Sequence, residues 1–317
     1  FMAPEVLLFT VYQALVYLFH EYFQSFRRRR VNNHVIICGL GDRGFRLASN
    51  CRADGRRVVV IEKKPYNPYL RLCRQKKIIE GQIPSVCLLD PDGDILRHLL
   101  STKRAERNPY WACYHTDLYQ FAYDGIEFGI VACAVGAPYA VLIAEEMFVS
   151  GCELLISVTS SCQIVSAGEP PYFVLIERAL RDEGTSHHYL PPSHYTELTF
   201  ALSAQLTGAL DDLPEPIVRR ATWTTDAPFR ETATAIEFAR SEGILAVEME
   251  AAALYAFAQA REKSVVCFAH VTNQMGAIEG DFEKGEDNGS RDALALAVAT
   301  ARACMDRTRR KECHKQP

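Results

Sequence analysis

Short apolar runs alternate with polar turns from residue 78 onward, a pattern typical of an α/β domain. Continuous apolar runs predict buried strands at 84–89, 154–158, 218–222 and 264–269. Helical spacing predicts helices at 140–150, 198–211 and 290–300. Alternation around Asp124-Gly125 predicts a hairpin. We also expect a turn at 159–162, and an insertion or lid at 167–195 built around one helix at 173–182.

The stretch 244–260 contains the most continuous apolar segment of this region. It begins as a short strand at 244–247, passes Glu248, Met249 and Glu250, and continues as an Ala-rich helix that is apolar nearly all round. Such a helix belongs in a core. A carboxylate at the start of a buried helix needs hydrogen-bond donors, and the helix dipole contributes at most about 1 kcal/mol. The alternative is an ordinary capping glutamate with a solvated neighbour.

Composition narrows the class of protein. At 317 residues there is room for one large domain or two modest ones, and a net charge of -4 argues against a general nucleic-acid binder. The 11 cysteines show no CxxC pair and no Cys/His ligand spacing. We therefore predict free thiols in a reducing cytoplasm, no metal site and no nucleic-acid partner.

Residues 5–24 are strongly apolar and end against four arginines, 27–30. The uninterrupted part, 6–19, is shorter than the roughly 20 residues that span a bilayer. Three interpretations stay open: an interfacial or truncated membrane helix with a basic flank, a helix packed on another subunit, or a core helix. Contact with a membrane through residues 5–30 is therefore an open alternative to a purely cytoplasmic location.

Residues 34–62 have the pattern strand, glycine-rich turn, helix, strand, acid. The turn is Gly39-x-Gly41-x-x-Gly44, and Glu62 follows the second strand. The first two glycines allow a tight turn and close approach of a pyrophosphate, the third allows helix and strand to pack, and the acid is placed to hold an adenosine ribose.

This segment resembles the NAD-binding half of the domain that regulates potassium uptake systems, over about residues 32–75. The resemblance implies NAD as a ligand of Gly39, Gly41, Gly44 and Glu62. The second half of such a domain is missing, so a βαβ unit without nucleotide is the alternative. An NAD-dependent dehydrogenase built on 39–62 is disfavoured because no hydride-transfer partner is evident.

The run Val247 to Ala253 resembles the signature of the nucleoside phosphorylase/nucleosidase superfamily. In that family the Met packs under the ribose and the second Glu accepts hydrogen bonds from its 2′ and 3′ hydroxyls. The resemblance assigns these roles to Met249 and Glu250, with Glu248 also at the substrate. The chemistry fits, because a diol offers two donors and a carboxylate only accepts.

Two further segments resemble the family's phosphate-binding loops, with departures. Gly93 and Arg97 match a G-D-x-x-R loop, and Ser160 occupies the place of a phosphate-binding Thr. Ser157 occupies the position at which the family has an arginine that binds phosphate. Amides of the expected turn at 159–162 still offer an anion-binding surface. Phosphate as a co-substrate and hydrolysis by water therefore both remain open.

The base-binding positions are also altered. Asp226 matches the family, whereas Pro228 takes the place of an aromatic residue and Phe229 lies next to it, either to stack on the base or to pack in the core. Asn273 stands where purine-specific members carry an aspartic acid that protonates the leaving base. An amide hydrogen-bonds a base but delivers no proton, which favours 6-oxopurines or pyrimidines. The resemblance makes Asn273 and Glu250 the catalytic pair.

The predicted architecture is a three-layer α/β domain with a mixed central sheet at 78–308. An apolar helix and basic linker (1–31) and a partial Rossmann-like βαβ unit (32–77) precede it, and a basic tail (309–317) follows. The resemblance, over 78–305, implies an enzyme that cleaves a nucleoside to free base and ribose or ribose 1-phosphate. It implies no required cofactor and a homo-oligomer. The alternative function is a non-catalytic module that senses a nucleoside or NAD.

Overall fold

The computed structural model describes residues 34–38, 47, 50–51, 54–61, 81–215, 217–274 and 283–313; for residues 34, 36–38, 57, 59–61 and 306–313 it describes the backbone alone. The chain separates into two compact units, residues 1–67 and 68–317, which are described one at a time. None of the described helices is long and apolar enough to cross a membrane.

The first unit contains two of the predicted strands. β1 (His34–Cys38) pairs in parallel with β2 (Arg57–Ile61), with His34 opposite Arg57. The glycines Gly39, Gly41 and Gly44, the acid Glu62 and the apolar run 5–24 lie outside the described residues. NAD binding and membrane contact therefore stay predictions.

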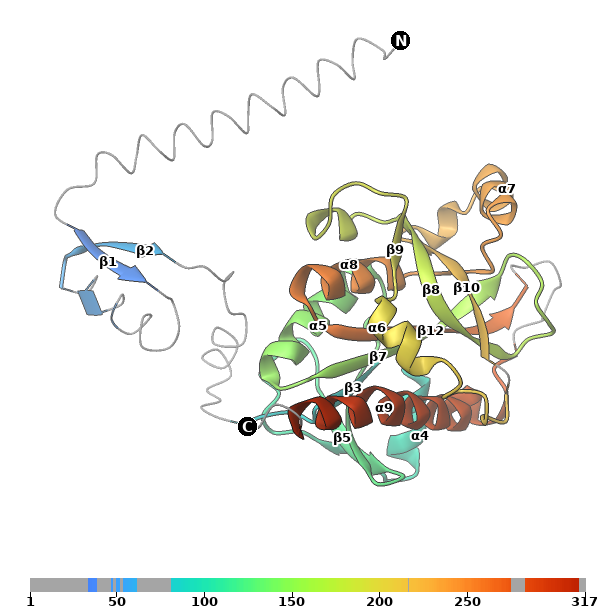
Figure 1. Cartoon of the computed structure of the whole chain (residues 1–317), viewed down its shortest axis with the longest axis horizontal. Helices are drawn as coiled ribbons and strands as arrows, with labels where there is room; N and C mark the ends of the chain where they lie inside the picture. Colours follow the sequence, from blue (N-terminus) through green and yellow to red (C-terminus); the bar gives the residue numbers. More distant parts are fainter. Residues whose placement is uncertain are drawn as a thin grey trace, which may run out of the picture. The chain divides into compact units, whose positions relative to one another are not determined.

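The second unit is built on one mixed sheet, shown in Figure 1. Its strands are β3 (Val86–Asp90), β4 (Glu106–Arg107), β5 (Tyr119–Tyr123), β6 (Ile126–Ala132), β7 (Leu154–Gln163), β8 (Tyr172–Asp182), β9 (Tyr195–Glu197), β10 (Ile217–Thr225), β11 (Ala246–Glu248) and β12 (Ser264–Asn273). The order is β11-β10-β8-β12-β7-β3-β6-β5-β4, with β9 on β8. β3, β6, β7 and β12 run parallel to one another, whereas β8 is antiparallel to β12. The predicted mixed α/β fold is confirmed.

One end of this sheet closes on itself. β11 pairs in parallel with β10 and also antiparallel with β7, where Val247 lies opposite Cys162. The strands β7, β12, β8, β10 and β11 therefore form a ring, and residues just beyond β11 lie beside the end of β7.

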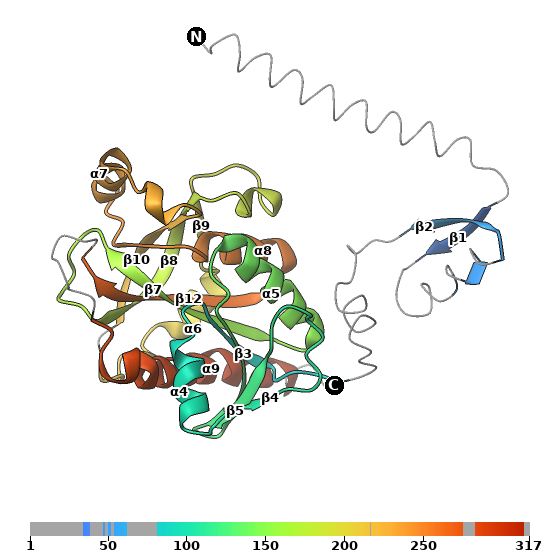
Figure 2. The same cartoon turned by 180° about the vertical axis from the view of Figure 1, so that it is seen from behind.

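Helices cover both faces of the sheet, as the two opposite views show (Figures 1 and 2). The helices are α4 (Asp94–Ser101), α5 (Ala137–Ser150), α6 (Phe200–Leu206), α7 (Ala233–Ser241), α8 (Ala251–Arg261) and α9 (Ser290–Cys313), with 3-10 turns at Ser186–His188, Pro228–Arg230 and Glu286–Gly289. α5 packs on α8, whereas α4 and α6 pack on α9. α8 is buried almost throughout, as its apolar circumference predicts.

Two local predictions are wrong. Residues 173–182 form strand β8 in the middle of the sheet instead of a helix in a lid. The first four side chains of this segment are all buried. When a short apolar run is covered on both faces, its sequence shows no hydrophobic periodicity, so the pattern does not distinguish a strand from a helix. Residues 159–162 continue β7 instead of forming a turn, because β12 pairs with them on one side and β11 on the other.

Candidate active site

Several of the polar residues singled out in the second unit lie where parallel strands end and three helices begin. α4, α5 and α8 start at Gly93, Gly136 and Glu250, close to the carboxyl ends of β3 and β6 and the distal part of β7. Ligands of open α/β sheets bind at such carboxyl edges, and helix N-termini there favour anions and hydrogen-bond acceptors.

Glu250 is held at this edge by one specific contact. Its Oε1 accepts a hydrogen bond of 2.7 Å from the backbone N–H of Gly136, which has a φ of 92° that suits glycine. Oε2 is buried, since only 1% of Glu250 is exposed, and no donor among the described residues meets hydrogen-bond geometry with it; the Thr159 hydroxyl interacts with this carboxylate and lowers its pKa, against the larger effect of burial. A buried acceptor without a donor lowers the stability of the folded protein. A bound ligand that donates a hydrogen bond to Oε2 would remove this unfavourable contribution.

Glu248 has a different environment. Its carboxylate accepts hydrogen bonds from the hydroxyls of Thr222 and Thr224 on β10 and from the backbone N–H groups of Glu250 and Ala251. Both oxygens are used, and only 3% of the residue is exposed. Direct contact with substrate stays a prediction for Glu248; its observed contacts fix the start of α8 and thereby the position of Glu250.

The loop after β3 is fixed by a carboxylate that we did not identify from the sequence. Asp90 Oδ1 accepts from Gly93 N at 3.0 Å and Asp90 Oδ2 from Leu96 N at 2.9 Å. Gly93 has a φ of 80°, and a Cβ there would lie 2.8 Å from the Arg97 guanidinium. Burial raises the pKa of Asp90 to about 7, against the opposing effect of these two hydrogen bonds.

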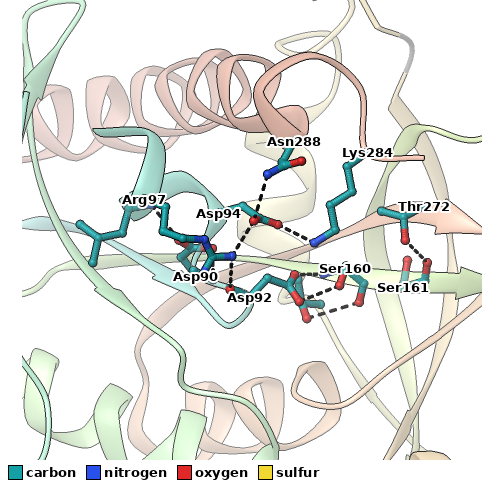
Figure 3. A network of polar contacts seen from close by, with 12 residues as sticks. Asp90, Asp92, Asp94, Arg97, Ser160, Ser161, Thr272, Lys284 and Asn288 are labelled. Carbon is teal, nitrogen blue, oxygen red and sulfur yellow. Dashed lines mark hydrogen bonds and ion pairs between the residues drawn. The ribbon is translucent and has the colours of Figure 1, made fainter. Parts of the chain in front are cut away.

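Arg97 and Ser160 both contact Asp92, Arg97 at its backbone carbonyl and Ser160 at its carboxylate, and their role as phosphate ligands stays a prediction. The Arg97 guanidinium also pairs with Asp94 at 2.6 Å and is 61% exposed. The N–H and the hydroxyl of Ser160 each donate to the Asp92 carboxylate, at 2.7 Å (Figure 3). Ser157, in the expected arginine position, is buried, and its hydroxyl has no partner among the described residues.

Asn273 and Met249 lie at the site edge and are half-buried. A register shift between β12 and β7 falls between Val271 and Asn273, and bulges of this kind redirect side chains beside active sites. The Asn273 amide donates to Thr272 Oγ1 at 3.2 Å. The roles of Asn273 in base binding and of Met249 under the ribose stay predictions.

His270 is a buried residue of β12 that we also did not identify. It lies opposite Ser160 in register and stacks on Phe173, with ring centroids 4.5 Å apart. Burial and the charge of Lys284 lower its pKa to about 4, so the ring is neutral near pH 7. Lys284 itself forms an ion pair with Asp94.

The two predicted base-binding residues after β10 lie at the surface. Asp226 is exposed and accepts a hydrogen bond from Gly184 N at 2.9 Å. Phe229, in the 3-10 turn Pro228–Arg230, is 99% exposed. Phe229 is therefore not part of the core, which was one of the two interpretations, and stacking on a base stays a prediction.

A cluster of potential metal ligands lies outside this edge. Cys113, His115 and Glu146 each offer one ligand atom, all within 4.8 Å of one another. Burial raises the pKa of the Cys113 thiol to about 11. Sequence spacing missed this cluster because Glu146 comes from α5 and the other two from the segment before β5.

We predict that the free energy of unfolding falls between pH 6.5 and pH 8. The folded-state pKa values of Asp90 (about 7) and Glu250 (about 8, raised by burial and then by Glu248) exceed their ordinary values. The native state therefore binds more protons than the unfolded state in this window, so stability decreases as pH rises. His270, with its folded-state pKa of about 4 and an ordinary value of 6.5, acts in the opposite direction, because the unfolded state still binds part of a proton at pH 6.5; this offsets only about 0.4 kcal/mol of the loss.

The expected loss is roughly 2 kcal/mol over the window. It is measured by urea unfolding at pH 6.5, 7.25 and 8. Asp90→Asn and Glu250→Gln should each flatten the pH dependence, Glu250→Gln more strongly. A wild-type stability that rises with pH over this window would contradict both assignments.

Comparison with known proteins gives the following matches. Residues 86–307 match the sequence profile of the family described as the phosphorylase superfamily. A guanosine phosphorylase of Halorubrum lacusprofundi is 29% identical over 180 residues, covering 54% of this chain and 74% of that protein. An uncharacterized protein of Acanthamoeba polyphaga mimivirus is 27% identical over 172 residues, covering 54% of this chain and 64% of that protein. Uridine phosphorylase of Vibrio fischeri ES114, alone and complexed with 6-hydroxy-1-naphthoic acid, shares the fold, with a TM-score of 0.59, 18% identity, and coverage of 71% of this chain and 93% of that one.

Proposed function

The chain belongs to the phosphorylase superfamily, and from that premise we propose that it is an enzyme that cleaves the N-glycosidic bond of a nucleoside. Guanosine and uridine phosphorylases among the similar proteins support this reaction. The products are a free base and a ribose or ribose 1-phosphate. Assembly as a homo-oligomer is part of the proposal.

The proposal rests mainly on the burial of the Oε2 atom of Glu250 at the start of α8. No donor among the described residues meets hydrogen-bond geometry with it, although the Thr159 hydroxyl interacts with the carboxylate, while Oε1 is fixed by Gly136. The 2′ and 3′ hydroxyls of a ribose supply the donors that this atom lacks, and a carboxylate that accepts from them also stabilises positive charge on the ring. Such charge develops when the bond between C1′ and the base breaks, so the contact strengthens in the transition state.

The base is proposed to be a 6-oxopurine or a pyrimidine. Asn273 at the end of β12 offers an amide that hydrogen-bonds a carbonyl or ring nitrogen but cannot transfer a proton. Adenine-type leaving groups need protonation more than these bases do. The names of the two similar enzymes contain one nucleoside of each kind: guanosine, whose base is a 6-oxopurine, and uridine, whose base is a pyrimidine.

Release of free base from a panel of nucleosides tests the proposal. Guanosine, inosine and uridine should release base at least about tenfold faster than adenosine, because Asn273 cannot act as a general acid. Each nucleoside is incubated with the protein and the base is quantified by chromatography. Glu237→Gln, a change on the exposed face of α7, serves as the control variant.

A sensing module is the second candidate, favoured by Ser157 in place of an arginine and by Asn273 in place of an acid. It predicts that nucleosides bind without base release, which calorimetry alongside the panel distinguishes. Binding of NAD by the first unit is a separate proposal, supported by the parallel pairing of β1 with β2. Titration of the protein with NAD tests it.

A further inference from the structure

The cluster of Cys113, His115 and Glu146 lies outside the site described above, and the proposed reaction does not use it. Cys113 and His115 belong to the segment between β4 and β5, whereas Glu146 lies on α5. A sulfur, an imidazole and a carboxylate therefore come together from two separate segments of the chain. Their ligand atoms all lie within 4.8 Å of one another.

The separations in this cluster suit one small cation. The imidazole Nδ1 and Nε2 atoms of His115 lie 2.9 and 3.8 Å from Cys113 Sγ. With the usual zinc–sulfur and zinc–nitrogen bond lengths and tetrahedral angles, two such ligands of one zinc ion lie roughly 3.5 Å apart. The observed distances lie on either side of this value, so a small rotation of the imidazole places both ligands correctly.

The cluster is closed on one side and open to solvent on the other. Cys113 and Glu146 are buried, whereas His115 is exposed. A thiolate and a carboxylate that share a buried position repel each other, and a cation bound between them removes this repulsion. The exposed imidazole gives an ion a path from solvent and leaves a fourth coordination position for water.

The loop that carries two of the three ligands is already folded onto the helix that carries the third. Trp111 is buried, and its indole N–H donates to Thr116 Oγ1 at 2.9 Å, which closes a short loop around the first two ligands. The His115 ring packs edge-on against Tyr139 of α5, with ring centroids 5.5 Å apart. Tyr139 and Glu146 are separated by about two helical turns, so they lie on the same face of α5.

We propose that Cys113, His115 and Glu146 bind a zinc ion that joins the segment between β4 and β5 to α5. A thiolate ligand disfavours Mg²⁺ and Ca²⁺, which prefer oxygen, whereas zinc accepts sulfur, nitrogen and oxygen ligands together. On binding, the thiol proton goes to solvent, the sulfur bonds to zinc, and water fills the fourth position. This proposal replaces the expectation, based on ligand spacing in the sequence, that the chain has no metal site.

The role of this zinc ion is structural. α5 begins next to Glu250, where Gly136 donates to the carboxylate, and Glu146 lies about 15 Å further along the same helix. The ion therefore holds a loop against α5 at a distance from the ribose-binding carboxylate. Its effect is expected on the stability and the hydrogen exchange of this part of the protein, and neither readout depends on turnover.

The metal content of the wild-type protein is measured first. Protein expressed with added zinc and then desalted should contain about one zinc ion per chain, as elemental mass spectrometry measures. Replacement of the zinc by Co²⁺ should give the near-ultraviolet absorption of a cobalt–thiolate bond and the visible bands of tetrahedral cobalt. Absence of bound zinc, or cobalt bound without thiolate absorption, would overturn the proposal and leave only a hydrogen bond between thiol and imidazole.

Variants then assign the bound zinc to these residues, because the chain has 11 cysteines and 9 histidines in all. His115→Ala, which changes an exposed side chain, and Cys113→Ser should each weaken zinc binding at least about tenfold. Cys113→Ser should also abolish the cobalt–thiolate absorption. Glu145→Gln changes the adjacent carboxylate of α5, which pairs with Arg261, and as the matched control should bind zinc like the wild type. Wild-type affinity in both His115→Ala and Cys113→Ser would place the zinc elsewhere and overturn the assignment.

Hydrogen exchange and thermal unfolding test the structural role. Removal of zinc by a chelator should speed amide exchange in residues 111–116 and lower the Tm of the wild type, because an ion that binds only the native state stabilises it. His115→Ala and Glu146→Gln should respond to the chelator much less, whatever their own Tm. Exchange and Tm that do not change when the wild type loses its zinc would contradict the structural role.

Discussion

Glu250→Gln is expected to lower kcat/KM for nucleoside cleavage by about 10²- to 10³-fold, the usual range for loss of one preorganised electrostatic contact in a transition state. The amide keeps the size of the side chain and can still accept at one atom from Gly136. It removes the negative charge that faces the ribose when C1′ becomes cationic. Steady-state rates of base release give the effect, and Glu237→Gln on α7 should retain wild-type rates.

We also expect the effect of Glu250→Gln on kcat/KM to depend on pH. Burial and the neighbouring Glu248 raise the pKa of Glu250 to about 8, so the free protein carries a neutral Glu250 at lower pH. Because the charged form is the active one, wild-type kcat/KM should increase as pH rises toward and beyond 8. The defect of Glu250→Gln should therefore be larger at pH 8.5 than at pH 6.5. A defect that does not depend on pH, or wild-type kcat/KM in the variant, would contradict the ribose-binding role.

Glu248→Ala should reduce the free energy of unfolding by about 3–5 kcal/mol, the usual cost of removing the acceptor from a buried, hydrogen-bonded charge site. The change leaves two hydroxyls and two backbone N–H groups at the junction of β10, β11 and α8 without their acceptor. It also leaves a cavity where the side chain was. Urea unfolding of wild type and variant gives the difference.

Two further variants serve as references for the expected loss of stability in Glu248→Ala. Glu237→Ala removes a carboxylate that is 70% exposed and should cost less than about 1 kcal/mol. Glu248→Gln retains one carbonyl acceptor and should fall between wild type and Glu248→Ala. A loss below about 1 kcal/mol for Glu248→Ala would show that the four donors find other partners and that Glu248 does not hold α8 in place.

The sequence predicted most of this unit because its elements have strong local signals. The strands at 154–158 and 264–269 and the helix after Glu250 are continuous apolar segments, and their direct structural counterparts are β7, β12 and α8. The resemblance around Glu250 also identified the residue whose buried oxygen carries the proposed function.

The features that the sequence did not predict share a physical cause: each of them is determined by contacts between distant parts of the chain. Residues 173–182 have an apolar run that fits strand or helix, and only pairing with β12 and β10 decides between them. Asp92 has the composition of a solvated turn, and nothing local indicates that its carboxylate reaches Ser160. Likewise, His270 becomes a buried neutral ring only through Phe173 and Lys284.

The strands of the second unit differ in how much of their backbone stays open to another strand. β11 pairs on both sides, with β10 and β7, but it covers only Thr222–Thr224 of β10, so residues 217–220 of β10 pair with β8 alone. The opposite end of the strand order is β4, which has only two residues, Glu106 and Arg107, both exposed and charged. A short charged edge is a poor template for strand addition and protects against aggregation. The β4 edge is therefore a poor place for a second copy of this unit to extend the sheet, whereas residues 217–220 of β10 are a longer edge.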